Sequence, residues 1–438
     1  MPDKPNVLVL FTDQQRWDTV GAYGDNPMEL TPNIDAMARR GTLFENAFTC
    51  QPVCAPARGS ILTGRYATAH TVWKNSLVLP QSEITLARAL KPHGYCVGYI
   101  GKWHLAQTVR APVPLELRGG FDDYWLAADV LEFVSHPYDT VMFGQDNERV
   151  ALPGYRVDAL TDMTIKYLQE RGGEPFFLFV SWLEPHHQND MNRYVAPDGY
   201  AARYANPYVP PDLQGVPGDW YRELPSYYGI VKRIDECFGR IFASLEELGL
   251  DENTIVLFTT DHGSHFRTRN SEYKRSCHEA CTRIPMIAQG PGFDRRLVAP
   301  ELVSLVDVAP TILDAAGVPV PEAMQGRSAM PLLDRDTSGW PEEAFIQISE
   351  AICGRAIRTQ RWKYCVYAPD KRGGQDSCSD EYVEYQMYDL FADPHERVNL
   401  VGRRDYREVA DELGERLKRR MVEAGEEEPR IQPARYYA

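Results

Sequence analysis

The sequence lacks three features that would assign it to other classes of protein: an excess of basic charge, a long apolar run and a dense set of paired cysteines. Its formal net charge is −15, which argues against a nucleic-acid partner because phosphate binding needs a basic face. The apolar run at residues 7–11 is far too short to span a membrane. Nine cysteines, an odd number, predict no disulfide framework.

The start of the chain shows no basic segment followed by a long apolar core, so no signal peptide is visible. We therefore expect a cytoplasmic protein with reduced thiols and no membrane segment. Hydrophobic residues make up 43% of the chain and charged residues 25%, which is typical of a globular protein with a large core. The acidic balance still permits a small anionic substrate, provided that basic side chains gather around it.

Three apolar runs are each followed within a few residues by polar, reactive side chains. The runs cover residues 6–12, 176–182 and 254–260. Continuous apolar runs of this length are typical of buried parallel strands. Asp13, His186 and Asp261 follow the three runs in turn, and open α/β sheets place ligands at the carboxyl ends of their strands. The pattern predicts a site at one edge of a parallel sheet.

The texture of the sequence changes at about residue 343, where short strand-like runs alternate with turns before a final amphipathic helix. We expect residues 1–342 to form a catalytic domain and residues 343–438 a small domain with an antiparallel sheet and a helix. The expected fold class is α/β: a large mixed, mainly parallel sheet flanked by helices, with a smaller C-terminal α+β domain.

The most informative motif is Cys54–Arg58 (CAPAR), continued by residues 59–65 (GSILTGR). It resembles the signature Cys/Ser-x-Pro-x-Arg of the formylglycine-dependent sulfatases, which have the fold of the alkaline phosphatase superfamily. In that family the cysteine is oxidised to formylglycine, whose hydrate attacks sulfur with one hydroxyl and expels sulfate with the other. The resemblance implies that Cys54 is the nucleophile precursor and that a formylglycine-generating enzyme matures it. The alternative is a plain buried thiol.

Two further segments resemble the metal-binding segments of the same family. Asp13 and Gln14 form the first, and Asp261 and His262 form the second. The resemblance implies that these side chains and the modified Cys54 surround a divalent cation. Oxygen ligands make Ca²⁺ the first expectation, while the histidine and the uncharged Gln14, which stands where the family usually has an acid, leave Mg²⁺ or Mn²⁺ open. A cap or turn role is the alternative for Asp13.

The segment Gly-Lys-Trp-His that contains Lys102 and His104 closely matches a sulfatase motif. The resemblance implies that Lys102 contacts the sulfate and that His104 takes a proton as sulfate is released. A Pro-His pair implies that His186 is the general acid for the leaving group, with the adjacent His187 as its rival or as a substrate contact. Lys274 lies in a Lys-x-x-x-His-Glu stretch and is implied to bind sulfate.

The remaining candidates surround the same chemistry. Arg58 is expected to donate a planar fork of hydrogen bonds to the oxygens of the nucleophile, and Asn75 is expected near the substrate. With the cation, the positive charges of Arg58, Lys102 and Lys274 would stabilise the charge that develops in the transition state. Residues 388–400 (YDLFADPHERVNL) resemble a further signature of the family's smaller domain.

We therefore expect a sulfatase that hydrolyses a sulfate ester on a saccharide or another small molecule. Carbohydrate sulfates are the preferred class, because much of the family acts on sugars. Two alternatives stay open: a phosphonate or phosphate ester hydrolase of the same superfamily, and an arylsulfatase that acts on a non-sugar sulfate. The sequence leaves open the position of the sulfate, exo or endo action, and the oligomeric state.

Overall fold

The computed structural model describes residues 4–24 and 26–436, and its main feature is a large sheet in the first three quarters of the chain. Eleven strands of the described chain form this sheet. In spatial order they are β11 (Leu297–Ser304), β2 (Thr42–Phe48), β10 (Met286–Gln289), β8 (Thr254–Thr260), β1 (Asn6–Thr12), β7 (Phe176–Ser181), β3 (Cys96–Lys102), β4 (Tyr124–Ala128), β5 (Thr140–Phe143) and β6 (Arg149–Leu152), with β9 (Arg283–Ile284) paired to β2.

The central strands β8, β1, β7, β3 and β4 run parallel, whereas β10 is antiparallel to both of its neighbours. Every residue of β1 is buried. Val7 and Val9 belong to one apolar cluster and Leu8 and Leu10 to the other, because successive side chains of a strand point to opposite faces. One continuous apolar strand therefore supplies the core on both sides of the sheet.

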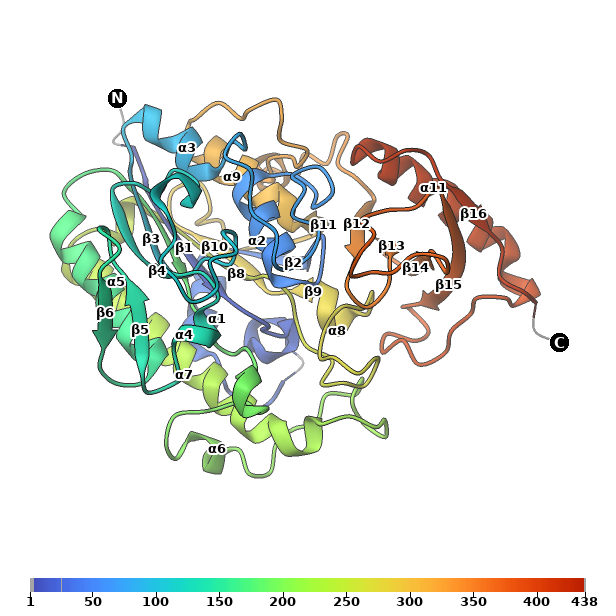
Figure 1. Cartoon of the computed structure of the whole chain (residues 1–438), viewed down its shortest axis with the longest axis horizontal. Helices are drawn as coiled ribbons and strands as arrows, with labels where there is room; N and C mark the ends of the chain where they lie inside the picture. Colours follow the sequence, from blue (N-terminus) through green and yellow to red (C-terminus); the bar gives the residue numbers. More distant parts are fainter. Residues whose placement is uncertain (1–3, 25, 437–438) are drawn as a thin grey trace.

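Helices cover both faces of the sheet (Figure 1). The first cluster includes side chains of α2 (Cys54–Thr63), α3 (Leu86–Leu90), α9 (Val308–Ala315) and α10 (Met330–Leu333). The second includes side chains of α1 (Pro32–Arg40), α5 (Arg156–Arg171) and α7 (Trp220–Glu247). Shorter helices are α4 (Leu131–Val134), α6 (Tyr200–Arg203) and α8 (Glu279–Thr282). The 3₁₀ turns are η1 (Trp17–Thr19), η2 (Gly21–Tyr23), η3 (Lys91–His93), η4 (Leu115–Leu117), η5 (Asn189–Met191), η6 (Asp251–Asn253), η7 (Leu305–Asp307) and η8 (Arg404–Tyr406).

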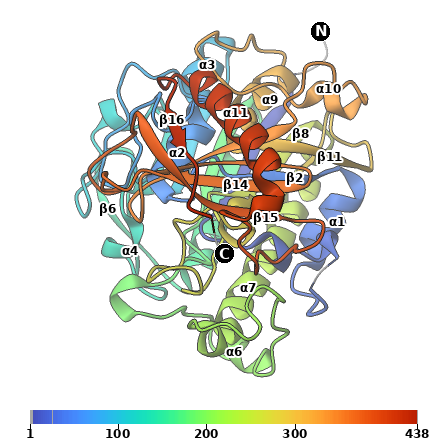
Figure 2. The ribbon, with the colours of Figure 1, turned by 90° about the vertical axis from the view of Figure 1, so that its right-hand side faces the viewer.

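Five further strands of the described chain form a second sheet at the C-terminal end. They are β12 (Glu343–Ile348), β13 (Gly354–Thr359), β14 (Trp362–Tyr367), β15 (Glu381–Asp389) and β16 (Arg430–Gln432), antiparallel except for the β15–β16 pair. Helix α11 (Arg407–Glu423) lies across one face of this sheet (Figure 2). The expected fold class is thus confirmed: a large, mainly parallel sheet flanked by helices and a smaller α+β unit.

The two sheets share a core and a buried ionic contact. One apolar cluster contains Val303 of the large sheet and Phe345 of the small one. Lys363 of β14 is fully buried, and its Nζ donates to the carbonyl of Cys277 at 2.6 Å and lies 2.7 Å from Glu279 Oε1. The change in sequence texture near residue 343 thus coincides with the start of β12, while an independent domain there stays a prediction.

Among the described residues, no helix combines the length and the apolar character needed to cross a membrane.

Candidate active site

Four of the predicted metal ligands converge at the carboxyl ends of β1 and β8. Asp13 follows β1, Asp261 and His262 follow β8, and Cys54 is the first residue of α2. All four are buried, and one donor atom from each lies within 4.8 Å of the others. Since β1 and β8 pair in parallel and in register to their last residues, their ends bring the two aspartates together.

The two aspartates differ in how their charges are compensated. Burial opposes ionisation of Asp13, but Lys102, His186 and Arg58 outweigh it and hold the pKa of this carboxyl below its usual value. Burial raises the pKa of Asp261 to about 7, and the charge of Asp13 adds to the rise. No described hydrogen-bond donor reaches Asp261 Oδ2. A buried carboxylate oxygen without a donor is a group that a cation would satisfy, so the four residues fit a divalent metal.

Gln14 has its side-chain amide engaged by protein groups. Its Oε1 accepts the backbone N–H of His187 at 3.1 Å, and its Nε2 donates to the hydroxyls of Tyr194 and Ser264. Its backbone N–H donates to Asp261 Oδ1 at 3.0 Å. Gln14 thus supports the metal-binding segments from within the protein, and its predicted role as a ligand stays a prediction.

Two buried lysines flank the nucleophile position, where the Cys54 thiol stands in for a formylglycine hydroxyl. Lys274 Nζ lies 2.7 Å from Cys54 Sγ and 3.0 Å from His262 Nε2. Lys102 Nζ lies 2.9 Å from Asp13 Oδ2. Burial alone would raise the pKa of Cys54, but Lys102 and Lys274 outweigh it and lower that pKa well below its usual value. The site is therefore built to hold negative charge at residue 54.

Arg58 lies one turn after Cys54 in α2, and its guanidinium makes hydrogen bonds to surrounding protein groups. Its guanidinium donates to Asp13 Oδ2 at 2.9 Å, to the carbonyl of Lys102 at 2.7 Å and to Ser181 Oγ at 2.6 Å. These bonds connect Asp13 with the ends of β3 and β7 and give the buried Asp13 carboxylate a fixed counter-charge. The expected fork to the oxygens at residue 54 stays a prediction.

The adjacent residues His186 and His187 have different surroundings. His186 Nε2 lies 3.9 Å from Asp13 Oδ1, and a hydrogen bond from His186 also lowers the pKa of Cys54. Burial lowers the pKa of His186 itself. The rings of both histidines pack against Tyr273, that of His187 with centroids 5.4 Å apart. Of the pair, His186 faces the nucleophile and His187 lies behind Tyr273.

His104 is carried on a loop that one buried residue anchors. The Asp129 carboxylate accepts the backbone N–H groups of Ala106 at 3.0 Å, Thr108 at 2.8 Å and Val109 at 3.2 Å, and its carbonyl accepts that of His104 at 2.8 Å. His104 and Val109 have left-handed φ values of +59° and +57°, which are costly for a β-branched valine. A hydrogen bond from His104 also lowers the pKa of Cys54.

Asn75 caps the helix that begins at the nucleophile. Its side-chain Oδ1 accepts the backbone N–H of Ala55 at 3.1 Å, and its backbone N–H donates to Glu350 Oε1 at 2.7 Å. The structure thus brings Asn75 next to Cys54 through the backbone of α2. Its predicted contact with substrate stays a prediction.

Three residues of this region were not predicted from the sequence. Asp129 follows β4, the neighbour of β3, which was the only signal for it. Glu132 is buried with its Oε1 3.3 Å from Lys102 Nζ. Burial opposes its ionisation, but Lys102 and the site histidines lower its pKa to about 2. The Tyr273 hydroxyl lies 3.3 Å from His186 Nε2, and its place just before Lys274 could have suggested it.

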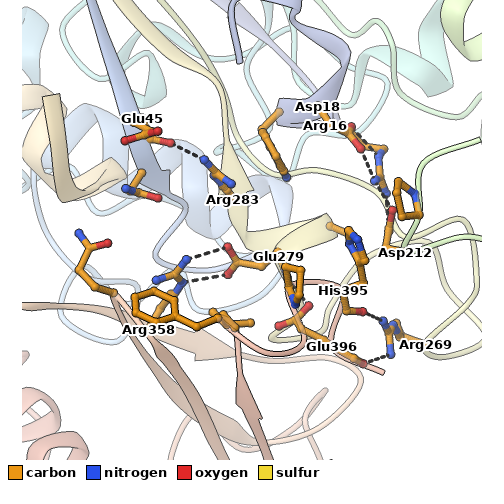
Figure 3. A pocket seen from close by; sticks show the side chains of 18 of the residues that line it. Arg16, Asp18, Glu45, Asp212, Arg269, Glu279, Arg283, Arg358, His395 and Glu396 are labelled. Atoms are coloured by element: carbon orange, nitrogen blue, oxygen red, sulfur yellow. Dashed lines mark hydrogen bonds and ion pairs between the residues drawn. The ribbon is translucent and has the colours of Figure 1, made fainter. Parts of the chain in front are cut away.

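A separate pocket of about 520 Å³ opens along the seam between the two sheets. Figure 3 shows two of its arginines facing acids of the same pocket: Arg358 pairs with Glu279, and Arg16 with Asp18 and Asp212. Its lining includes none of the described residues predicted for the site. Arg16 and Arg358 are therefore paired within the protein.

Comparison with known proteins identifies the family. Residues 5–318 match the sulfatase family, and residues 271–423 match the C-terminal region of N-sulphoglucosamine sulphohydrolase. The chain is 30% identical to an ulvan-active sulfatase of Formosa agariphila, with 97% of this chain and 83% of that protein covered. It is 25% identical to an N-acetylglucosamine-6-O-sulfatase of Bacteroides thetaiotaomicron, with 97% and 88% covered.

Solved structures share the whole fold. A phosphonate monoester hydrolase of Agrobacterium radiobacter superimposes with a TM-score of 0.76 at 23% identity, covering 96% of each chain. An enzyme solved with its substrate D-glucosamine-2-N,6-O-disulfate gives a TM-score of 0.79 at 23% identity, covering 97% of this chain and 98% of the other. These likenesses show that the chain shares the fold of these enzymes. With most of its length matched by family and relatives, this chain belongs to the sulfatases and is a sulfuric ester hydrolase.

Proposed function

We propose that this sulfatase releases sulfate from a carbohydrate ester, with residue 54 as formylglycine and a divalent cation beside it. The observation that carries the proposal is the buried group of Asp13, Cys54, Asp261 and His262, whose donor atoms lie within 4.8 Å of one another. Family membership supplies the reaction class, and the names of two relatives, which refer to ulvan and N-acetylglucosamine, supply the class of substrate.

The cation site consists of Asp13, Asp261, His262 and the oxygen of residue 54, with Gln14 as the weaker candidate. Ca²⁺ is the first expectation, with Mg²⁺ and Mn²⁺ as alternatives. When bound, such a cation polarises sulfate oxygens and favours the ionised nucleophile. Asp261 Oδ2, which accepts no hydrogen bond from the described protein groups, would be one of the ligand atoms.

The lysines bind and orient the sulfate group. Lys274 Nζ is 2.7 Å from the atom at the nucleophile position, and Lys102 is fully buried beside Asp13. Two ammonium groups in a buried site stabilise charge on the sulfate oxygens more strongly than they would in water. In this proposal Arg58 acts one step away, by holding Asp13 and the end of β3 in place.

The two histidines move protons at opposite ends of the reaction. His186 donates a proton to the bridging oxygen as the alcohol leaves, so that the sugar departs as a neutral hydroxyl compound. His104 then accepts the proton of the hydroxyl at residue 54 while sulfate departs. His104 and His186 both contribute to the lowered pKa of Cys54, which supports their access to the reacting atoms.

The test is sulfate release measured by ion chromatography on enzyme co-expressed with a formylglycine-generating enzyme. The panel contains ulvan oligosaccharides, N-acetylglucosamine 6-sulfate, 4-nitrophenyl sulfate and a phenyl phosphonate ester. We expect the highest kcat/KM on a sulfated sugar and none with the Cys54→Ala variant. A higher kcat/KM on the phosphonate ester than on every sulfate would overturn the proposal. A preference for the aryl sulfate would point to a non-sugar substrate instead.

A further inference from the structure

Tyr273 packs between the two histidines of the tandem pair. Only 6% of its surface is exposed. Its ring meets that of His186 edge-on, with centroids 5.5 Å apart, and that of His187 at 33° with centroids 5.4 Å apart. Lys274 Nζ lies 5.4 Å from the centre of the same ring. These contacts fix the ring and therefore fix the place of its hydroxyl.

The Tyr273 hydroxyl lies between the side chains of Asn189 and His186. Its oxygen is 3.0 Å from Asn189 Oδ1 and 3.3 Å from His186 Nε2. Burial raises the pKa of Tyr273 to about 12, so the hydroxyl keeps its proton at neutral pH. When that proton is donated to Asn189, a lone pair of the tyrosine oxygen faces His186 Nε2 and can accept its N–H.

The other nitrogen of His186 is already committed. His186 Nδ1 lies 2.6 Å from the carbonyl oxygen of His187, and because a carbonyl only accepts, Nδ1 must donate there. Nε2 is therefore the nitrogen that exchanges a proton with a leaving group. It points toward the nucleophile, since it lies 3.9 Å from Asp13 Oδ1.

We propose that Tyr273, oriented by Asn189, is a positioning residue: its oxygen accepts the N–H of His186 Nε2 before substrate binds, which fixes the ring in the orientation from which that proton passes to the leaving-group oxygen. This inference rests on the proposed function, in which His186 is the general acid. The contribution depends on the substrate. A sugar hydroxyl is a poor leaving group and needs the proton, whereas a nitrophenolate leaves well without it. Tyr273 would thus serve carbohydrate esters more than activated aryl esters.

The experiment compares the wild type with Tyr273→Phe on phenyl sulfates whose substituents span a range of leaving-group pKa. Phenylalanine keeps the ring contacts with His186, His187 and Lys274 and removes only the hydroxyl. We expect kcat/KM to fall about tenfold on unsubstituted phenyl sulfate and less than about twofold on 4-nitrophenyl sulfate. The plot of log kcat/KM against leaving-group pKa should therefore become steeper.

Two further variants separate positioning from general damage. Tyr228→Phe removes another buried tyrosine hydroxyl bond, from Tyr228 to the carbonyl of Tyr208 at 2.8 Å, and should leave the slope unchanged. Asn189→Ala changes an exposed residue and should steepen the slope in the same direction as Tyr273→Phe, which keeps the test available if the latter fails to fold.

A double mutant completes the test. Adding Tyr273→Phe to His186→Asn should cause no further loss, because both changes remove one function. Equal losses across the phenyl sulfates, or additive losses in the double mutant, would overturn the role of Tyr273 while leaving the sulfatase intact. A wild type that cleaves no sulfate ester in either panel would instead overturn the proposed function.

Discussion

Asp129→Asn tests whether one carboxylate sets the position of His104. The carboxylate is fully buried, and its two oxygens accept three backbone N–H groups of the loop that follows His104. Asparagine has nearly the same shape but only one acceptor oxygen. If that oxygen serves Thr108 and Val109, the amide nitrogen then faces the N–H of Ala106, and two donors oppose each other.

The magnitude follows from those three bonds. One hydrogen bond to a charged acceptor is lost, and two become bonds to a neutral one, which together cost about 3–5 kcal/mol of the free energy of unfolding. The left-handed φ values of His104 and Val109 add strain that the weakened loop can relieve by moving. We expect His104 to shift and the release of sulfate to slow by about 10–100-fold.

The assay is rapid-mixing kinetics with 4-nitrophenyl sulfate. Since His186 is undisturbed, nitrophenol release in the first turnover should stay fast, and the slow sulfate release should then appear as a burst equal to the enzyme concentration. The free energy of unfolding is measured in urea under the same conditions. A variant with no burst, whose two steps slow equally, would refute the positioning of His104 by Asp129.

Asp235→Asn is the matched control. The buried Asp235 carboxylate accepts the backbone N–H groups of Asn33 and Ile34, both at 2.9 Å, at the start of α1. Burial raises the pKa of Asp235 to about 6, so the comparison is made at pH 8, where this carboxylate is ionised. We expect a loss of stability of the same kind without any burst.

Three other outcomes are expected. Cys54→Ala should reduce sulfate release to background, measured by ion chromatography, because no other described side chain occupies the nucleophile position; residual turnover above background would contradict that assignment. Chelation with EDTA should lower both Tm and kcat, and Ca²⁺, Mg²⁺ or Mn²⁺ should restore them, adding about 3 kcal/mol at a hundredfold excess over Kd; a Tm insensitive to chelator and ions would argue against a metal at Asp261. Burial raises the pKa of Glu396 from 4.5 to about 7. The folded state therefore binds this proton more tightly than the unfolded state, and the free energy of unfolding falls by up to about 3 kcal/mol as pH rises through that window. Glu396→Gln should flatten this part of the urea-unfolding profile between pH 5 and 8, and an unchanged profile would contradict the assignment.

The apolar runs and their polar ends predicted the core of the site, because parallel strands deliver their carboxyl ends to one edge of a sheet. Asp13 and Asp261 meet for that reason, although the order of β8 and β1 was not readable from the chain. The antiparallel strand β10 was likewise not predicted. Pairing between distant strands depends on side-chain packing across the whole sheet, which no local pattern encodes.

Residues that support the reactive groups were the hardest to predict. Asp129 and Tyr273 belong to no motif, and each acts through neighbours that only the fold supplies. Arg58 was predicted to contact the nucleophile directly, and Gln14 was predicted to contact the metal. Their hydrogen bonds go to the surrounding protein, because buried polar groups must be satisfied before they can serve a ligand.

The buried lysine of β14 links the far end of the chain to catalysis. Lys363 donates a hydrogen bond to the carbonyl of Cys277 and forms an ion pair with Glu279, in the segment that begins at Lys274. In a second contact between the two parts, the backbone N–H of Gln347 donates to the carbonyl of Cys50, shortly before the nucleophile. A chain cut at residue 342 would keep the side chains proposed to contact the sulfate but lose these two contacts, so we expect the truncated chain to lose turnover.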